Sequence, residues 1–311
     1  MDFAQLQAFV KVAEYRSFSK AAQALHITQP AISKRISTLE STLDTVLFER
    51  LGQRIMLSET GQKLLPEAQL ILDKMEHLRD LTGESDNPIR GKLRIATSHH
   101  IGLYRLPNML QQFVTTYPDA QLDMHFTDSE VAHQAVIHGS ADIAIATLPT
   151  TADNQLDITP LWSDTLMMML GKSHPLATQK HLDLATLCQY PAILPDEGTF
   201  TRRIIDDVLK SNELQCRIAF TTNYLETIKV MVEAGLGWSV LPAIMKSHKL
   251  IAHPLASGLA SQLSTQSLAQ SSAHPPTRSL GVMIHKNKQI TPTLSALLTC
   301  LYQHTAPNER I

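Results

Sequence analysis

The spacing of apolar residues along the first 60 positions predicts three short helices followed by a pair of strands. Apolar or small side chains recur at helical spacing in three runs: Phe3, Leu6, Phe9, Val10 and Ala13; then Ala21, Ala22 and Leu25; then Ile32, Ile36 and Leu39. Asp2 and Gln5 have the spacing of a capping box at the start of the first run. Two short apolar segments, Leu47-Phe48 and Ile55 to Leu57, then predict strands joined by a turn that carries Arg50, Gly52, Gln53 and Arg54.

The third predicted helix has two different faces. Thr28 is placed to cap it, and Pro30 is tolerated in its first turn. Its apolar residues share one side, and the other side carries Pro30, Ser33, Lys34 and Ser37. A helix that is buried on one side and carries short donors and a cation on the other, held by a preceding helix across a tight turn, is the layout of a helix-turn-helix. The alternative is a three-helix packing module whose polar face meets only water, and the basic turn between the two strands argues against it.

A seven-residue repeat follows the strands. The repeat places Leu57, Gly61, Leu64, Ala68, Ile71, Met75 and Leu78 in one stripe. It predicts a long helix over about 58–82, and pairing with the same helix of a second chain would bury the stripe. The predicted dimerisation residues are Leu64, Ala68, Ile71, Met75 and Leu78. The alternative is packing of the stripe on the chain's own C-terminal domain.

From Lys92 onward, strand patterns alternate with helix patterns, which predicts a mostly parallel sheet covered by helices. The predicted strands are 92–97, 121–127, 141–147, 165–171, 191–195, 217–222, 237–242 and 279–286. The predicted helices are 103–118, 129–139, 182–188, 201–211, 224–235 and 291–302. The last strand and helix are expected to return to the first group of elements. Two α/β lobes joined by two crossings leave a cleft between them, where small molecules commonly bind.

Composition and charge narrow the class of protein. Hydrophobic residues make up 43% and charged residues 18% of the 311 residues, as in folded soluble proteins. No run approaches the roughly 20 apolar residues of a membrane span, and the N-terminus lacks a signal peptide, so a cytoplasmic protein without membrane contact is expected. The formal charge of -2 gives no global sign of nucleic acid, but residues 1–58 carry seven basic and five acidic residues. The three cysteines, Cys188, Cys216 and Cys300, are expected to be free thiols.

The run "SFSKAAQALHITQPAISKRISTLESTLDTVLFERLGQRIMLSETG" resembles the N-terminal winged helix-turn-helix of LysR-type transcriptional regulators. The matching positions are Ala21, Ala22, Leu25, Gln29, Pro30, Ala31, Ser33, Leu39, Glu40, Leu47, Phe48, Arg50, Leu57 and Gly61. The segment "VEAGLGWSVLP" is similar to a segment of the same family's effector domain. One departure is Asp44, where the family usually has glycine.

The resemblance implies a fold of three parts within the α/β class. Residues 1–58 would form the winged helix-turn-helix DNA-binding domain, 59–90 the dimerisation linker helix and hinge, and 91–311 a two-lobed effector domain like the periplasmic binding proteins. Lobe I would span about 91–160 and 278–311 and lobe II about 161–255. The remaining loop, 256–277, is rich in Ser, Ala and Gln and has no assigned role.

The resemblance also implies the functional residues. The DNA contacts would be Thr28, Gln29, Pro30, Ser33, Lys34, Arg35, Arg50 and Arg54. The effector contacts would be Ser98, Ser129, Thr147, Thr199, Phe200 and Thr222, although helix capping is an alternative role for each hydroxyl. His99 or its neighbour His100 is a further candidate for contact with the effector. No Arg lies at these positions, so a charged effector would depend on backbone donors, hydroxyls or Arg202. A small polar or carboxylate-bearing metabolite is expected.

The implied partners are double-stranded DNA with interrupted-palindrome promoter sites, a small-molecule effector and further copies of the chain as a dimer or tetramer. RNA polymerase is a further partner that such a regulator could contact. The rival interpretation is a solute-binding protein of a transport system, which predicts a signal peptide and leaves the basic N-terminal region unexplained.

Enzyme and metal chemistry find little support in the sequence. An enzyme would need a catalytic constellation, and the chain carries no G-x-S-x-G, phosphate-binding loop or dinucleotide fingerprint. The histidines His99, His100, His125, His133 and His138 lack the spacing of a shared metal site. We therefore expect no catalytic residue, no metal and no cofactor.

Overall fold

The computed structural model describes residues 1–51, 54–81, 88–151, 153–179, 182–255 and 276–305. The N-terminal domain begins with three helices, α1 (Phe3–Tyr15), α2 (Phe18–Ala24) and α3 (Gln29–Leu43). An antiparallel pair of strands follows, β1 (Phe48–Leu51) and β2 (Arg54–Leu57). The predicted capping box is confirmed: the Asp2 carboxylate accepts from the Gln5 N–H, and the Gln5 side chain accepts from the Asp2 N–H. The three predicted helices and two strands are all present.

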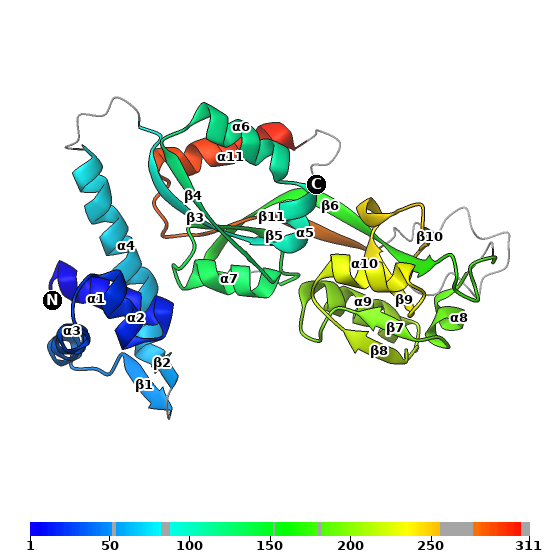
Figure 1. Cartoon of the computed structure of the whole chain (residues 1–311), viewed down its shortest axis with the longest axis horizontal. Coiled ribbons are helices and arrows are strands. Elements are labelled where there is room, and N and C mark those ends of the chain that lie inside the picture. The colour runs from blue at the N-terminus through cyan, green and yellow to red at the C-terminus, as the bar shows by residue number, and fades with distance from the viewer. Residues whose placement is uncertain (52–53, 82–87, 152, 180–181, 256–275, 306–311) are drawn as a thin grey trace.

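Helix α4 (Glu59–Leu81) leads from the N-terminal domain toward the remainder of the chain (Figure 1). Its start is fixed by Ser58, whose hydroxyl accepts from the Gly61 N–H at 3.0 Å and donates to the Val46 carbonyl at 2.6 Å. A Cβ on Gly61 would meet the carbonyl oxygen of Leu47. The Leu-Ser-x-x-Gly segment therefore packs the first turn of α4 directly against the chain entering β1.

Lobe I is built on a sheet with helices on both faces (Figure 1). Its elements are β3 (Gly91–Ser98), α5 (His99–Tyr104), α6 (Pro107–Thr116), β4 (Ala120–Thr127), α7 (Ser129–Ile137), β5 (Ile143–Thr147), β11 (Thr277–His285) and α11 (Pro292–His304). β3 pairs in parallel with β4 and with β5, and β11 adds to β5 antiparallel. The expected return of the last strand and helix to this lobe is confirmed.

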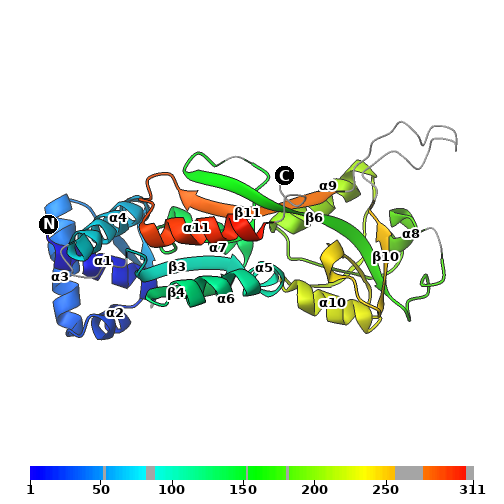
Figure 2. The ribbon, with the colours of Figure 1, turned by 90° about the horizontal axis from the view of Figure 1, so that it is seen from above.

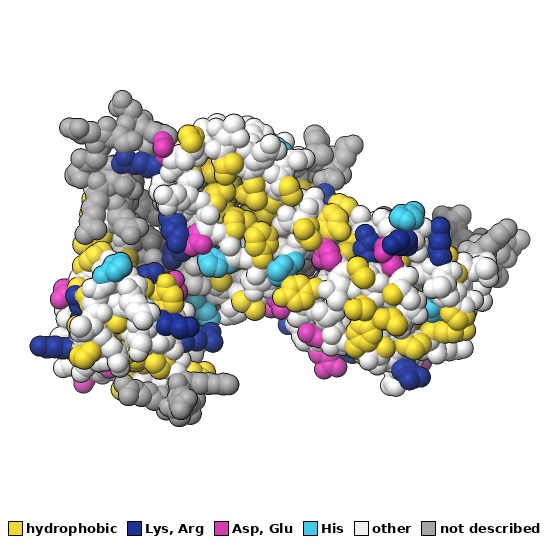
Figure 3. All heavy atoms as spheres, viewed as in Figure 1, with side chains coloured by type: hydrophobic (Ala, Val, Ile, Leu, Met, Phe, Trp, Pro, Cys, Tyr) yellow, Lys and Arg dark blue, Asp and Glu magenta, His cyan; other side chains and the backbone are white. Residues whose placement is uncertain are grey.

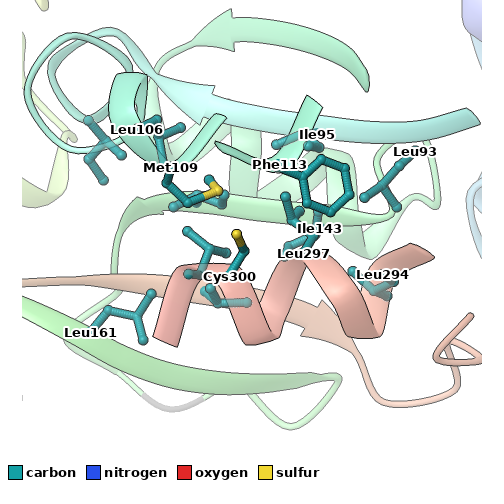
Figure 4. Close-up of a cluster of buried hydrophobic side chains, with 14 of the residues drawn as sticks. Leu93, Ile95, Leu106, Met109, Phe113, Ile143, Leu161, Leu294, Leu297 and Cys300 are labelled. Atoms are coloured by element: carbon teal, nitrogen blue, oxygen red, sulfur yellow. The ribbon is translucent and has the colours of Figure 1, made fainter. Parts of the chain in front are cut away.

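The main core of lobe I lies between the sheet and the helices α6 and α11 (Figure 4). Phe113 and Met109 of α6 and Leu297 of α11 are fully buried there against strand residues such as Ile95 and Ile143. A second, smaller core on the opposite face of the sheet packs α7 through small side chains. Strand β5, which is buried at all five positions between these two cores, accordingly begins with four apolar residues in a row.

Strand β6 (Leu156–Gly171) joins the lobes. Its first part pairs with β11, and from Leu166 it pairs with β9 (Trp238–Pro242) and β10 (Leu250–Pro254). Lobe II adds α8 (Leu184–Cys188), β7 (Ala192–Leu194), α9 (Phe200–Ser211), β8 (Ile218–Thr221), α10 (Leu225–Glu233) and the short 3-10 helix η1 (Ala243–Met245). The described strands β3–β11 form one sheet in the order β4-β3-β5-β11-β6-β9-β7-β8, with β10 beside β6. Figure 2 shows β6 and β11 running side by side from one lobe into the other.

One predicted helix differs from the structure, and two strand segments were missed. The helix predicted over 103–118 is two helices, because Pro107 has no N–H to continue the hydrogen bonds of α5 and takes the first position of α6 instead. The first half of β6 was missed, since Asp157, Pro160 and Asp164 interrupt its apolar pattern. β10 was missed as well, and its partners lie in β6, about 80 residues earlier in the chain.

Linker helix α4 also contacts lobe I. Gly139, at the C-terminal end of α7, has a φ of +65°, and a Cβ there would lie 3.3 Å from both Pro66 and Gln69 of α4. Among the described residues, none of the helices is long and apolar enough to cross a membrane. The expected fold, a winged helix-turn-helix, a linker helix and a two-lobed α/β domain, is confirmed. The sheet is mixed rather than mostly parallel, because β6 pairs antiparallel with β9, β10 and β11, and β11 pairs antiparallel with β5.

Candidate functional sites

The exposed face of α3 carries the predicted DNA-contacting residues. Ile32, Ile36 and Leu39 are buried in the N-terminal core, whereas Thr28, Gln29, Pro30 and Lys34 are exposed and Ser33 and Arg35 are half-buried. Thr28 is the N-cap residue, but its side chain makes no capping hydrogen bond, contrary to expectation. Its hydroxyl is therefore available to an external partner, at the end of a helix whose first N–H groups also point outward.

The strand pair beside α3 is held by side chains that the sequence motif specifies. The Glu40 carboxylate accepts from the Leu47 N–H at 2.8 Å and the Phe48 N–H at 3.3 Å. Asp44 ends α3 in the left-handed conformation, with φ 48° and ψ 43°, which is the geometry that favours glycine at this position. Arg50 and Arg54 lie in β1 and β2, next to the turn; their side chains, and residues 52–53, lie outside the described part.

The predicted dimerisation stripe of α4 divides into two parts. Ala68 is 1% exposed, and with Leu65 and Leu72 it belongs to the core of the N-terminal domain, against which Leu64 also packs. Met75 is half-buried, and Ile71 and Leu78 are 40% and 61% exposed. The interpretation of Ala68 as a dimer contact is thus corrected. Ala68 packs within its own chain, because α4 covers the apolar core formed by the three helices of the N-terminal domain. Ile71 and Leu78 remain open to a partner.

A cavity of about 50 Å³ lies between the lobes. Five predicted effector residues line it: Ser98, His99, Ser129, Thr147 and Thr199. They come from the C-terminal ends of β3 and β5 and from the N-terminal ends of α5, α7 and α9. In α/β sheets, ligands commonly bind at this edge, where strands end and the following helices begin. The structure brings them together; their contact with an effector stays a prediction.

The capping alternative holds for one of these hydroxyls. Thr199 caps α9, since its Oγ1 accepts from the Arg202 N–H at 3.2 Å. Ser129 accepts from the Thr147 N–H at 3.2 Å and so ties α7 to β5. Ser98 is the N-cap residue of α5, but its side chain makes no capping hydrogen bond.

Two predicted effector residues do not line the cavity. The Phe200 side chain is 5% exposed and packs near His133, and Phe200 acts at the cleft through its N–H group instead. Thr222 accepts from the Tyr224 N–H within its own loop, at 3.4 Å. Arg202 is also excluded as the cation of the cleft, because its guanidinium bonds to Asp206 at 2.8 Å and to the Pro195 carbonyl at 2.9 Å.

The cation that lines the cavity is Arg278 of β11, which the sequence interpretation missed. Arg278 is 3% exposed and faces Asp164 of β6 across the strand pair. Its Nε and Nη2 donate to the Asp164 carboxylate at 3.3 and 2.9 Å, and its Nη1 donates to the Thr201 hydroxyl at 3.2 Å. No local pattern marks this arginine, since it lies just after the stretch 256–277, which is rich in Ser, Ala and Gln.

Asp164 is the centre of a buried charged cluster beneath the cavity. Besides Arg278, it accepts from Arg105 at 3.1 Å and contacts the His100 imidazole at 3.1 Å. Burial alone would raise the pKa of Asp164, but the hydrogen bond from His100 and the charge of Arg278 outweigh it and hold that pKa well below its usual value. Asp164 therefore connects the strands β6 and β11 to helix α5 through its carboxylate.

Several bonds cross the cleft. The Phe200 N–H at the start of α9 donates to the Glu130 carboxylate of α7, and the Asn223 amide donates to the Asp128 carboxylate at 2.9 Å. The His99 ring lies 4.7 Å from the Tyr224 ring, centroid to centroid. The His100 Nδ1 lies 3.7 Å from the Glu226 carboxylate, too far for a hydrogen bond. The lobes are thus held closed over the cavity by the side chains that line it.

Comparison with known proteins identifies both parts of the chain. Residues 3–62 match the sequence model of "Bacterial regulatory helix-turn-helix protein, lysR family", and residues 86–306 match that of "LysR substrate binding domain". The HTH-type transcriptional regulator CysL of Bacillus subtilis is 32% identical over 236 residues, which cover 76% of this chain and 79% of CysL.

Two solved structures share the fold over nearly the whole chain. A full-length variant of OxyR from Pseudomonas aeruginosa has a TM-score of 0.72 at 22% identity, covering 98% of this chain and 94% of OxyR. Full-length CbnR in complex with its target DNA has a TM-score of 0.58 at 21% identity, covering 98% of this chain and all of CbnR (100%).

Proposed function

Because this chain belongs to the LysR family and is a DNA-binding transcriptional regulator, we propose that α3 and the β1–β2 wing bind interrupted-palindrome promoter sites under control of a small polar metabolite. The observation that carries the proposal for DNA is the exposed face of α3. Thr28, Gln29 and Lys34 project from a helix whose opposite face is fixed in the core. Short polar side chains let a helix lie deep in a major groove, where base edges can be distinguished.

Binding to an interrupted palindrome calls for two copies of the chain. An inverted-repeat site presents two equivalent half-sites, so a two-fold dimer places one α3 on each. The exposed Ile71 and Leu78 of α4 support such a dimer. A second exposed apolar surface, over α6 and β4 of lobe I, includes Val114 and Phe126 and is available for the further contacts of a tetramer (Figure 3).

The cleft between the lobes is the proposed sensor. It is lined by hydroxyls, imidazoles, an amide, carboxylates and a guanidinium, which suits a small polar ligand. A ligand can shift the protein between arrangements only by the difference in its affinity for them. The contact of Gly139 with α4 offers a direct connection from lobe I to the linker helix.

The rival class, a solute-binding protein of a transport system, is set aside, because the curated relatives are transcriptional regulators and the N-terminal domain is a lysR-family helix-turn-helix. We further propose that the protein acts in the cytoplasm, where promoter DNA lies, that it has no catalytic activity, and that it contacts RNA polymerase when bound beside a promoter.

DNA binding is tested by a matched pair of substitutions in α3, measured against a specific promoter fragment and a scrambled one. Ser33→Ala should reduce the preference for the specific fragment, by about 1–3 kcal/mol if the hydroxyl reads a base. Lys34→Ala should weaken binding to both fragments alike and lower the slope of log affinity against log salt by about 1. Lys74→Ala, an exposed position on α4, serves as the control. Equal affinity of all four proteins for both fragments would refute the proposal.

A further inference from the structure

The cleft carries opposite charges on two of its sides. Asp128 and Glu130, at the start of α7, supply two carboxylates, and Arg278 of β11 supplies the guanidinium. Helix α7 of lobe I thus presents acidic groups, and strand β11 presents a basic group, to the same cavity. Among the residues that the structure describes, Arg278 is the single Lys or Arg that lines it.

The two carboxylates retain capacity to accept hydrogen bonds. Glu130 uses its Oε1 for the Phe200 N–H, and Asp128 uses its Oδ2 for the Asn223 amide. Within the described part of the chain, neither residue has a bond to its second oxygen and neither is paired with a Lys or Arg. A carboxylate has about four acceptor positions, so each of these groups can accept further bonds from a ligand.

Arg278 likewise has donors to spare. Its three hydrogen bonds, two to Asp164 and one to Thr201, use one hydrogen on each of its three nitrogens. A guanidinium carries five N–H groups, so two are left, one on Nη1 and one on Nη2. Arg278 lines the cavity and is buried, with an exposed fraction of only 3%, so a ligand held in the cavity can accept from these two donors.

The overall charge around the cavity decides between ligand classes. The residues that line the cavity carry two carboxylates, Asp128 and Glu130, against one guanidinium, Arg278. Together these three side chains hold an excess of one negative charge. A purely anionic ligand would add to that excess, and a purely cationic ligand would leave the remaining Arg278 donors unmatched. A ligand that carries both charges adds no net charge and satisfies both sides.

We infer that the effector is a small amphoteric molecule with an ammonium group and a carboxylate, as in an α-amino acid, held by Asp128 and Glu130 at one end and by Arg278 at the other. The inference rests on the proposed role of the cleft as the sensor. It narrows the expected polar or carboxylate-bearing metabolite to one class. The cavity of about 50 Å³ has room for roughly three or four water-sized groups, which limits the enclosed part of the ligand to about the amino acid head group.

The test uses the purified full-length protein and sets of matched probes. Thermal unfolding is measured at neutral pH with each of the common L-α-amino acids at millimolar concentration. Each amino acid is compared with its des-amino carboxylate and with its decarboxylated amine, for example alanine with propionate and ethylamine. At least one amino acid should raise the Tm by about 2 °C or more, the effect of a ligand present well above its Kd, and its two partial analogues should not.

Substitutions locate the bound probe. In Glu130→Gln the amide oxygen can still accept from the Phe200 N–H, so the link between the lobes is retained while the charge is lost. Its affinity for the stabilising amino acid, measured by calorimetry, should fall about tenfold, the effect expected for one charge-assisted bond. Asp207→Asn removes one negative charge from an exposed position on α9 and should leave that affinity unchanged.

The outcomes separate this inference from the proposed function. It is overturned when no amino acid stabilises the protein, when a des-amino carboxylate or an amine stabilises it equally well, or when Glu130→Gln binds as the parent does. DNA binding by the same preparations is measured independently. A protein that binds its promoter and is stabilised by a carboxylate alone remains a regulator with another class of effector, and one that ignores DNA contradicts the proposed function itself.

Discussion

Asp164 lies where the strands that join the lobes pass beneath the cleft, and it accepts hydrogen bonds from Arg105 and Arg278 while contacting His100. A buried carboxylate of this kind is stable only because its partners are present. Removing its charge leaves two guanidiniums without their common counter-ion, which is far more damaging than the loss of an exposed ion pair.

We expect Asp164→Asn to lower the free energy of unfolding by about 3–5 kcal/mol at pH 7. The pKa of Asp164 is depressed in the folded protein, so its stabilising contribution is complete above the ordinary value near 3.8 and is lost as the pH falls below it. The difference between the two proteins should therefore shrink in acid. Urea unfolding at pH 7 and between pH 4 and 3 measures it.

The control is Asp157→Asn, an exposed position in the same strand. This protein should unfold like the parent at every pH. A loss of stability in Asp164→Asn that is no larger than in this control would contradict the central position given to Asp164.

At the scale of elements, α4 illustrates how one stripe of apolar residues serves two purposes. Its first half covers the core of the N-terminal domain through Leu65, Ala68 and Leu72, and Ile71 and Leu78 remain exposed. A heptad repeat gives the direction of each side chain around a helix but not the identity of its partner. For this reason the sequence analysis assigned Ala68 to the dimer interface, whereas the side chain lies in the core of the N-terminal domain.

A pair of α4 variants separates the two purposes. Leu78→Glu should shift the protein from dimer toward monomer in analytical ultracentrifugation, by at least tenfold in Kd, with unchanged Tm of the N-terminal domain. Ala68→Glu should instead unfold that domain, because it buries a charge without a partner, which costs several kcal/mol. Lys74→Glu, exposed on the same helix, controls for the added charge. A Leu78→Glu protein that remains fully dimeric would exclude α4 as the dimer interface.

At the scale of the whole molecule, the lobes are held together by side chains from both sides of the cleft. The Glu130 and Asp128 carboxylates accept bonds from lobe II, and each charge-assisted bond contributes about 1.5–3 kcal/mol to the closed arrangement. The proposed effector would have to enter between the lobes, and these bonds oppose the opening of the cleft.

Removal of both links should therefore open the molecule. In Glu130→Ala combined with Asn223→Ala, we expect the open arrangement to gain at least tenfold in population, seen as a larger radius of gyration in small-angle X-ray scattering. Asn108→Ala, an exposed position on α6, should leave the scattering curve unchanged. An unaltered radius in the double variant would mean that β6 and β11 alone fix the lobe arrangement.

The N-terminal domain was predictable because its determinants are local. The Asp2 capping box and the face of α3 that carries Ser33 and Lys34 both depend on residues within one or two helical turns. Even the contact of Glu40 with the start of β1 spans only seven or eight residues. The order of strands and helices in the C-terminal domain was likewise readable, since each element carries its own periodicity.

The amino-acid sequence by itself therefore determined most of the helices and strands, the family resemblance, and the division of α3 into a buried and an exposed face. What only the tertiary structure decided is which distant residues meet: Arg278 bonds to Thr201, 77 residues away, and to Asp164, 114 residues away. Contacts of that range leave no periodic trace, because they depend on the pairing of β6 with β11 and on the closure of two lobes around them. Thus the cation of the cleft, the burial of Ala68 and the carboxylates that bridge the lobes follow from packing of the complete chain.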